Sequence, residues 1–189
     1  MAKDMVTKCA SSQWATKLAA AKAAGADAAD VLAARGTSVT IDVRNGALEQ
    51  AERSEGTDLG LRVFVGQQVA IVSVSDTSDR TIKDMAERAV AMAHEAPEDP
   101  FAGLADPREL VTEYDVAALE LSDPTPEPSA EALQEDASAA EASALENSGI
   151  SQVQSASAGY GARDIFLAAS NGFSGGYRRT DRGLSCVAI

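Results

Sequence analysis

The alternation of apolar and polar residues between positions 31 and 74 constrains the fold of this chain most. Val39, Ile41 and Val43 alternate with polar neighbours, and Leu59, Leu61, Val63 and Val65 repeat this spacing; residues 69–74 are a further short segment rich in β-branched residues. A two-residue period is typical of half-buried β-strands. The segments are separated by tight-turn sequences, namely Asn45-Gly46, Gly56-Thr57-Asp58 and Gly66-Gln67-Gln68. The sequence therefore predicts a four-stranded antiparallel meander with strands within 31–43, 47–54, 59–65 and 69–74.

Composition places the hydrophobic core in the same region. Alanine supplies 38 of the 189 residues, and Leu, Ile, Val and Phe together supply only about a fifth. That fraction of large aliphatic residues and phenylalanine is close to the level at which chains remain disordered. Because most of the β-branched residues lie in the predicted meander, we expect the core to be concentrated there.

Charge and hydropathy exclude two classes of partner. The formal net charge of −13 argues against nucleic-acid binding, which requires clustered Lys and Arg. No apolar segment approaches the roughly 20 residues that span a bilayer, and lysines interrupt the first 24 residues where a secretory leader would lie. We expect no membrane partner and a cytoplasmic protein. Cys9 and Cys186, at opposite ends of the chain, are expected to be buried free thiols.

Helices are predicted on either side of the meander and again near position 130. An alanine-rich helix covers about 4–24, with Trp14 as a large apolar anchor against a sheet. Helix-starting residues at 76–79 precede a second helix, which ends before Pro97. Its apolar stripe comprises Ile82, Met85, Ala86, Ala89, Val90 and Ala93. A third helix covers 129–147 with a weak apolar stripe, Leu133, Ala137, Ala140 and Ala144. Its acidic residues are expected to form a solvated face: Glu131, Glu135, Asp136, Glu141 and Glu146.

Six prolines between positions 97 and 128 mark a change in the chain. Residues 99–104 predict an ordered turn with Phe101 and Leu104 packed against the domain, and 122–128 predict an extended linker. Further strands are expected at 150–157, 163–169 and 177–189, with a hairpin at Ser170-Asn171-Gly172.

The fold class is α+β. The first domain, residues 1–115, holds an N-terminal helix, the meander and a packing helix. A Pro-rich linker at 116–128 leads to an incomplete second domain, 129–189, with a helix and antiparallel strands. The sequence stops within an apolar strand pattern, so we expect the N-terminal part of a longer protein whose middle domain is truncated.

No catalytic, cofactor-binding or metal-ligating residue can be assigned from the sequence. The single histidine, His94, is followed by Glu95, but no second histidine completes an H-E-x-x-H motif. His94 is better explained by its favourable interaction with the end of a helix. The P-loop and dinucleotide-binding patterns are also missing.

The order of the sequence motifs resembles the TldD/PmbA family, and within it the PmbA (TldE) branch. The motifs run from Arg44-Asn45-Gly46 through Gly60-Leu61-Arg62-Val63, Ser75-Asp76 and Asp99-Pro100-Phe101-Ala102-Gly103-Leu104 to Ala168-Ala169-Ser170-Asn171-Gly172-Phe173, Gly176-Tyr177-Arg178-Arg179-Thr180 and Leu184-Ser185-Cys186-Val187. The resemblance covers nearly the whole chain. Its strength lies in the order and spacing of the motifs together.

This resemblance implies a cytoplasmic subunit of a metallopeptidase heterodimer that acts on unfolded peptides, in a family also described as modulators of DNA gyrase. Zinc is expected in the TldD-type partner, whose ligands lie in its C-terminal region, and no cofactor is expected in this chain. The resemblance therefore implies an N-terminal scaffold and substrate-cleft segment that is inactive alone, with a TldD-like subunit or another copy of the chain as partner.

Two functions remain open from the sequence. In the first, the sheet edge around residues 59–75 pairs with an extended peptide substrate by β-augmentation. In the second, the chain is a non-enzymatic α+β module for interaction and assembly with a partner subunit.

Overall fold

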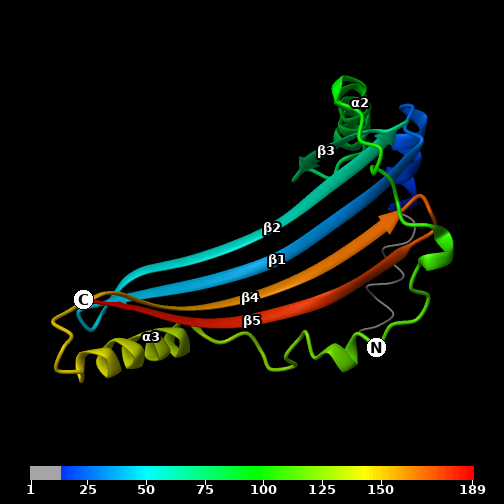
Figure 1. The fold of residues 1–189 in the computed structure, drawn as a ribbon. Helices are drawn as coiled ribbons and strands as arrows, with labels where there is room; N and C mark the ends of the chain where they lie inside the picture. Colours follow the sequence, from blue (N-terminus) through cyan, green and yellow to red (C-terminus); the bar gives the residue numbers. More distant parts are fainter. Residues whose placement is uncertain (1–13) are drawn as a thin grey trace. The chain divides into compact units, whose positions relative to one another are not determined.

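The computed structural model describes residues 14–189 and shows an α+β protein, which confirms the predicted class (Figure 1). Residues 14–23 are helical. The strands are β1 (Ala28–Arg44), β2 (Ala47–Val65), β3 (Gln68–Val74), β4 (Val153–Ala169) and β5 (Ser174–Ala188). They form one five-stranded sheet in the order β3-β2-β1-β4-β5. The helices are α2 (Asp79–Glu95) and α3 (Ala130–Leu145), with 3-10 turns at Pro107–Glu109 and Ala117–Leu119.

Three of the four predicted hairpin turns form. Asn45 and Gly46 join β1 to β2 with φ angles of 54° and 71°, which fits the turn expected from an Asn-Gly pair. Gly66, with φ of 57°, turns β2 into β3. Residues 170–172 connect β4 to β5. These turns confirm three chain reversals that local sequence alone predicted.

The meander has three strands, and the prediction of a fourth is wrong. No turn forms at residues 56–58, because β2 continues through them for 19 residues beside the 17-residue β1. In the same way, the separate strands predicted at 150–157 and 163–169 are one strand, β4. Because β2 and β4 both lie beside the long strand β1, continuous pairing lets more of their backbone N–H and C=O groups form hydrogen bonds than a turn would. The sheet therefore overrides the local preference for a turn.

Residue contacts divide the chain into two compact units. The first comprises residues up to 35 with 57–119 and 164–177, and the second comprises 36–56, 120–163 and 178–189. Four of the strands, β1, β2, β4 and β5, contribute residues to both units.

The core of the first unit lies between α2 and the sheet. All six residues of the predicted α2 stripe are buried there, as expected, against apolar residues of β1, β2 and β3. Ser78 is the N-cap of α2, and its hydroxyl accepts a hydrogen bond from the backbone N–H of Thr81. Trp14 packs against this core, and its ring stacks on Phe166 with a centroid separation of 5.2 Å, which confirms its role as an apolar anchor.

The core of the second unit lies beneath α3. Leu133 and Ala137 pack against Val39, Ile41 and Val43 of β1, together with Ala158 of β4. Ala140 and Ala144 are only half-buried, so the stripe is narrower than predicted.

One acidic residue of α3 is not solvated, contrary to the prediction. Glu141 is 4% exposed and accepts hydrogen bonds from the backbone N–H groups of Asn45 and Gly46, both at 2.7 Å. These two donors point out of the β1–β2 turn and need an acceptor, which the helix supplies across 95 positions of sequence. The periodicity of the helix around Glu141 could not predict this contact, because it depends on the distant turn at Asn45 and Gly46.

Two further predictions about burial are wrong. The turn at residues 99–104 is ordered, since Asp99 accepts from the backbone N–H of Phe101, but the Phe101 side chain is 93% exposed. Leu104 is half-buried. Cys186 is exposed because it lies on β5, an outer strand of the sheet. Cys9 lies outside the described residues.

Candidate functional site

The two outer strands of the sheet, β3 and β5, differ in how their edges are occupied. The proline-containing segment before α3 hydrogen-bonds to β5 and to the turn that precedes it. Asn171 Nδ2 donates to the carbonyl of Ala105, Gly176 N to the Tyr114 hydroxyl and Thr180 N to the carbonyl of Leu121, at distances of 3.0, 3.1 and 3.0 Å. The β5 edge is therefore partly covered by the chain itself.

The β3 edge carries no second strand within residues 14–189, because β3 pairs with β2 alone. A two-residue turn closes this hairpin, with Val65 opposite Gln68. Bonded and non-bonded pairs alternate in an antiparallel ladder, so Ala70 and Val72 bond to β2. The backbone groups of Val69, Ile71 and Ser73 then point outward. The edge predicted at residues 59–75 is thus narrower, since residues 59–65 lie inside the sheet.

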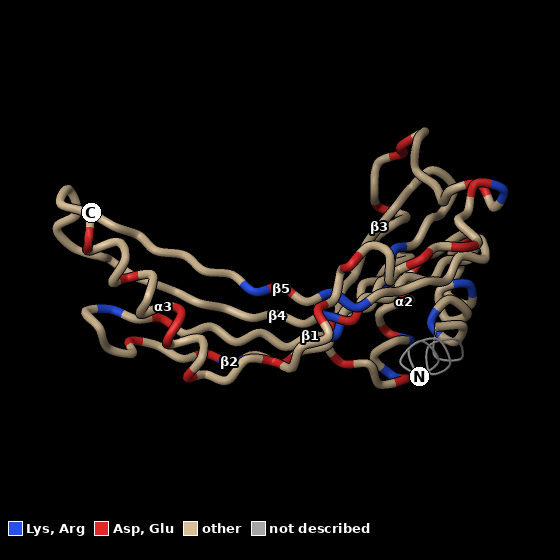
Figure 2. Tube along the Cα trace, turned by 90° about the horizontal axis from the view of Figure 1, so that it is seen from below, with Lys and Arg blue, Asp and Glu red and all other residues tan. Residues whose placement is uncertain are grey.

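The sequence of β3 lacks the usual protection of an edge strand. Its seven residues include no charge and no proline, and the strand is free of blue and red in Figure 2. Ile71, opposite Arg62 in the β2–β3 register, is 61% exposed. Soluble proteins commonly protect such edges with lysine, proline or a bulge, because an open edge pairs with other chains. The β3 edge therefore has the features of a strand-pairing site.

The strand is held in place on its other sides. Ala70 and Val72 are buried beneath α2. At the turn end, the Gln68 side-chain amide donates to the carbonyls of His94 and Ala96, at 3.1 and 2.6 Å. His94 itself lies in the last turn of α2 with an exposed side chain. These contacts fix the backbone of β3, so an incoming strand would meet an ordered template.

A bidentate ion pair lies on the sheet face beside this edge. Arg62 of β2 donates from Nε to both carboxylate oxygens of Asp30, at 3.2 and 3.0 Å, and Asp30 is 7% exposed. The Arg62 guanidinium also lies 5.2 Å from the centre of the Phe64 ring. Because the pair neutralises both charges, the region presents backbone and apolar groups without a fixed charge preference.

Four carboxyl groups within residues 14–189 have lowered pKa values, and Asp76 and Asp106 are two of them. The Thr81 hydroxyl and then the Ser78 backbone N–H donate to Asp76 and lower its pKa. Hydrogen bonds from Arg108 lower the pKa of Asp106. Both groups are held ionised at the starts of helical turns, whereas a general acid needs a raised pKa. Asp106 therefore caps its 3-10 turn, and Asp76 stabilises the turn that leads into α2.

Lys17 is the cation whose ionisation the fold disfavours. It is 8% exposed, and its ammonium lies 4.8 Å from the centre of the Trp14 ring. Burial lowers the pKa of Lys17, and the nearby charge of Asp79 partly opposes this shift. Lys17 is therefore a buried residue beside Trp14 and does not line either cavity of the described residues.

Residues 14–189 contain no group of three His, Cys, Asp or Glu side chains placed to hold a metal ion. The donors for a zinc site are therefore not assembled in the described part, and no chemical step can be assigned to zinc held by it. None of the helices in this part is long and apolar enough to cross a membrane.

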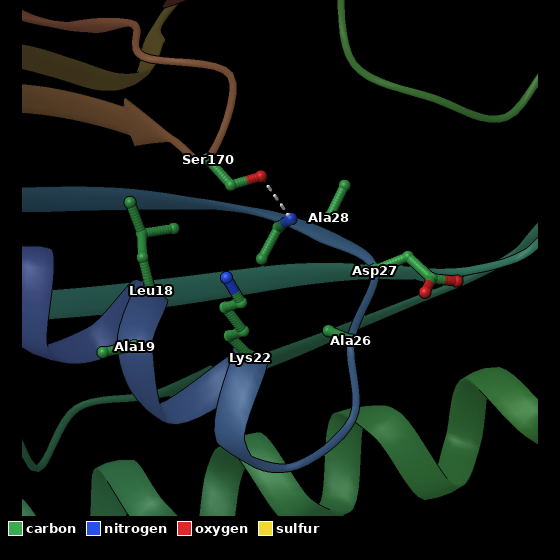
Figure 3. Close-up of a pocket in the computed structure, with 8 residues that line it drawn as sticks. Leu18, Ala19, Lys22, Ala26, Asp27, Ala28 and Ser170 are labelled. Atoms are coloured by element: carbon green, nitrogen blue, oxygen red, sulfur yellow. Dashed lines mark hydrogen bonds between the residues drawn. The ribbon is translucent and has the colours of Figure 1, made fainter.

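A cavity of about 280 Å³ in the first unit was not predicted from the sequence (Figure 3). It lies between the helix at 14–23, the start of β1 and the β4–β5 turn. Ser170 closes one side, where its hydroxyl accepts from the backbone N–H of Ala29 at 3.0 Å and its own N–H donates to the Ala29 carbonyl at 2.8 Å. Lys22 extends from the helix into this space. Lys22 and Ser170 belong to no recognisable sequence motif, so their proximity could not be predicted from the sequence.

Comparison with known proteins identifies the family. Residues 29–93 match the model for the PmbA/TldA metallopeptidase domain 1, and residues 123–189 match the model for the central domain of the same metallopeptidases. The chain belongs to the PmbA/TldD family. The β3 edge falls within the first of these matched domains, and α3 falls within the second.

Individual members of the PmbA/TldD family are similar over part of their length. A metalloprotease PmbA homolog from Haemophilus influenzae is 35% identical over 98 residues, which cover 52% of this chain and 21% of the homolog. A proposed modulator of DNA gyrase from Bacteroides thetaiotaomicron has a TM-score of 0.77 at 21% identity, covering 96% of this chain and 41% of that one. TldE from Thermococcus kodakarensis has a TM-score of 0.72 at 16% identity, covering 94% and 40%. The chain thus spans about two fifths of the length of these structures.

Proposed function

We propose that this chain is the N-terminal scaffold and substrate-cleft part of a PmbA/TldE-like subunit in a zinc-dependent peptidase heterodimer. In this proposal the β3 edge binds an extended stretch of unfolded peptide by strand addition. The zinc belongs to a TldD-type partner subunit, and the complex acts in the cytoplasm. The observation that carries the substrate role is the open, uncharged and ordered edge of β3.

Recognition through a strand edge suits unfolded substrates. The outward N–H and C=O groups of Val69, Ile71 and Ser73 would bond the backbone of the peptide, which is the same in every sequence. The neutral Arg62–Asp30 pair imposes no charge requirement on the peptide side chains. We therefore expect binding that depends on an extended backbone and only weakly on sequence.

The test uses the full-length subunit with its partner and compares Ile71→Pro with Ile71→Thr. Proline removes the outward N–H and places its ring at the edge, whereas threonine keeps the N–H and the β-branched shape. Position 71 does not bond to β2, so proline there leaves the β2–β3 ladder intact.

We expect Ile71→Pro to weaken binding of an unfolded peptide by about tenfold or more, since a hydrogen bond is lost and a steric barrier is added. Ile71→Thr should stay within about threefold of the parent. Circular dichroism and the thermal midpoint check that both variants are folded. Equal peptide affinity in the two folded variants would refute a role for the β3 edge.

An assembly module is the second candidate, and Phe101 is the observation that favours it. This ring is 93% exposed on a turn that is tied to the β2–β3 turn by the Asp99 N–H and the Gln67 carbonyl at 2.8 Å. Exposed aromatic side chains on ordered turns are frequent anchors of interfaces. Co-purification of the full-length product from its native extract separates the two: a zinc-bearing partner of similar fold supports the peptidase subunit, and a partner without that fold supports the module.

A further inference from the structure

We propose that the cavity beside Lys22 and Ser170 binds the carboxylate of a small aliphatic acid, of the size of the C-terminal residue of a peptide. Two sources share this chemistry, a free short-chain acid and a peptide end. The inference is independent of strand addition at β3, because the cavity and the β3 edge share no residue.

The charge inside the cavity favours an anion. Lys22 is an exposed residue that lines it, and its side chain forms no ion pair or hydrogen bond with any residue that the structure describes. The nearest lining acid, Asp27, turns its carboxylate away from the cavity (Figure 3) and accepts from the backbone N–H of Gly66 at 2.7 Å. Lys22 is therefore the cationic side chain of the lining, and the carboxylate of the one acidic lining residue, Asp27, is engaged elsewhere.

The serine supplies a second donor aimed at the same space. Ser170 Oγ is an acceptor for the backbone N–H of Ala29, which leaves the hydroxyl hydrogen available to a ligand. The two backbone and side-chain bonds between Ser170 and Ala29 hold this hydroxyl at the cavity wall. An ammonium and a hydroxyl that donate from two sides match the two oxygens of a carboxylate.

The remaining walls limit the ligand to a small apolar body. Leu18 and Ala26 are among the aliphatic residues that line the cavity, and its volume is about 280 Å³. That volume lies just below the range of about 300–1,000 Å³ for drug-sized ligands. A carboxylate attached to one or two small residues matches both the charge of Lys22 and the volume of the cavity.

The experiment is a titration of the ¹⁵N-labelled chain with three probes. They are N-acetyl-alanyl-alanine, its C-terminal amide and propionate, and the amide signals of Ala29 and Ser170 report on the cavity. We expect the acid to shift both signals and the amide to bind at least about tenfold more weakly, because it lacks the charge that Lys22 would bind. Equal affinity for the acid and the amide would overturn the proposal. So would unchanged amide signals of Ala29 and Ser170 at 20 mM acid, since about 20 mM is the weakest dissociation constant expected of such a contact.

The propionate arm distinguishes the two sources. Binding of propionate with an affinity close to that of the acid indicates a site for free small acids, whereas binding of the acid alone indicates a site for peptide ends. Either result supports a carboxylate site.

Variants assign the site to Lys22. Lys22→Gln should weaken binding of the acid by about tenfold, and Lys22→Arg should retain it within a few-fold because the charge is kept. Lys83→Gln is the matched control, since Lys83 is an exposed lysine of α2 outside the cavity. Ile71→Pro should also bind the acid normally, so failure of strand addition and failure of this site are separable. Unchanged binding in Lys22→Gln would refute the assignment.

Discussion

Replacing Glu141 with alanine should destabilise the second unit of the sheet more than any other acidic substitution on α3. The carboxylate is 4% exposed and accepts two hydrogen bonds of 2.7 Å from the β1–β2 turn. Hydrogen bonds to a charged group contribute about 1.5–3 kcal/mol each. Because Asn45 and Gly46 are exposed and would regain bonds to water, the net loss should be about 2–4 kcal/mol.

The assay is urea and thermal unfolding followed by circular dichroism. For a chain of this length each kcal/mol lowers the midpoint by about 2–4 °C, so Glu141→Ala should lower it by about 5–15 °C. Glu141→Gln keeps one acceptor oxygen and should fall between the parent and the alanine variant. Amide hydrogen exchange at Asn45 and Gly46 should accelerate in both variants.

Glu135→Ala is the control, because Glu135 is an exposed acidic residue on the same helix. It removes the same charge and should change stability by no more than about 0.5 kcal/mol. If Glu141→Ala and Glu135→Ala unfold at the same urea concentration, the two hydrogen bonds do not hold α3 to the turn and the reasoning is refuted.

Three further substitutions test the packing of the second unit, the turn before α2 and the approach of β5 to β4. Leu133→Ala should cost about 2–5 kcal/mol in urea unfolding, since this side chain of α3 is fully buried against β1 and β4, and a loss below 1 kcal/mol would contradict its place in the core. Asp76→Asn should flatten the acid dependence of stability: the Thr81 hydroxyl lowers the folded-state pKa of Asp76, so its contribution is present above about pH 4 and is lost as the pH falls through that lower pKa. Parallel stability curves for parent and variant below pH 4 would exclude this. Gly176→Ala should lower the thermal midpoint, because a Cβ at this position would lie 2.5 Å from the carbonyl oxygen of Ile165. An unchanged midpoint would contradict this prediction, since it would show that β4 and β5 move apart without cost.

Much of the fold could be predicted because its signals are local. The stripe of α2 repeats at helical spacing, so its six residues face one direction in any structure that contains the helix. The Asn45-Gly46 pair adopts a tight turn because both residues tolerate positive φ. The membership in the PmbA/TldD family likewise rests on the order of short motifs, which the family comparisons confirm.

The candidate sites depend on which strands become neighbours, and no local pattern contains that information. The edge at residues 59–75 was predicted as a whole, but pairing with β1 places residues 59–65 inside the sheet and leaves only β3 outside. The cavity requires Ser170 to lie beside Ala29, and these residues are 141 positions apart in sequence.

The sequence by itself determined the helices, three of the chain reversals and the place of the first core, because helix stripes, strand alternation and turn residues act over a few neighbouring positions. Tertiary structure decided that β2 runs past Gly56, that Glu141 is buried and that Phe101 is exposed. Each of these outcomes depends on a partner distant in sequence, or on the lack of one within residues 14–189. Backbone groups bond and side chains pack with whatever the fold brings next to them, so the open edge of β3 is a property of the assembled sheet rather than of its seven residues.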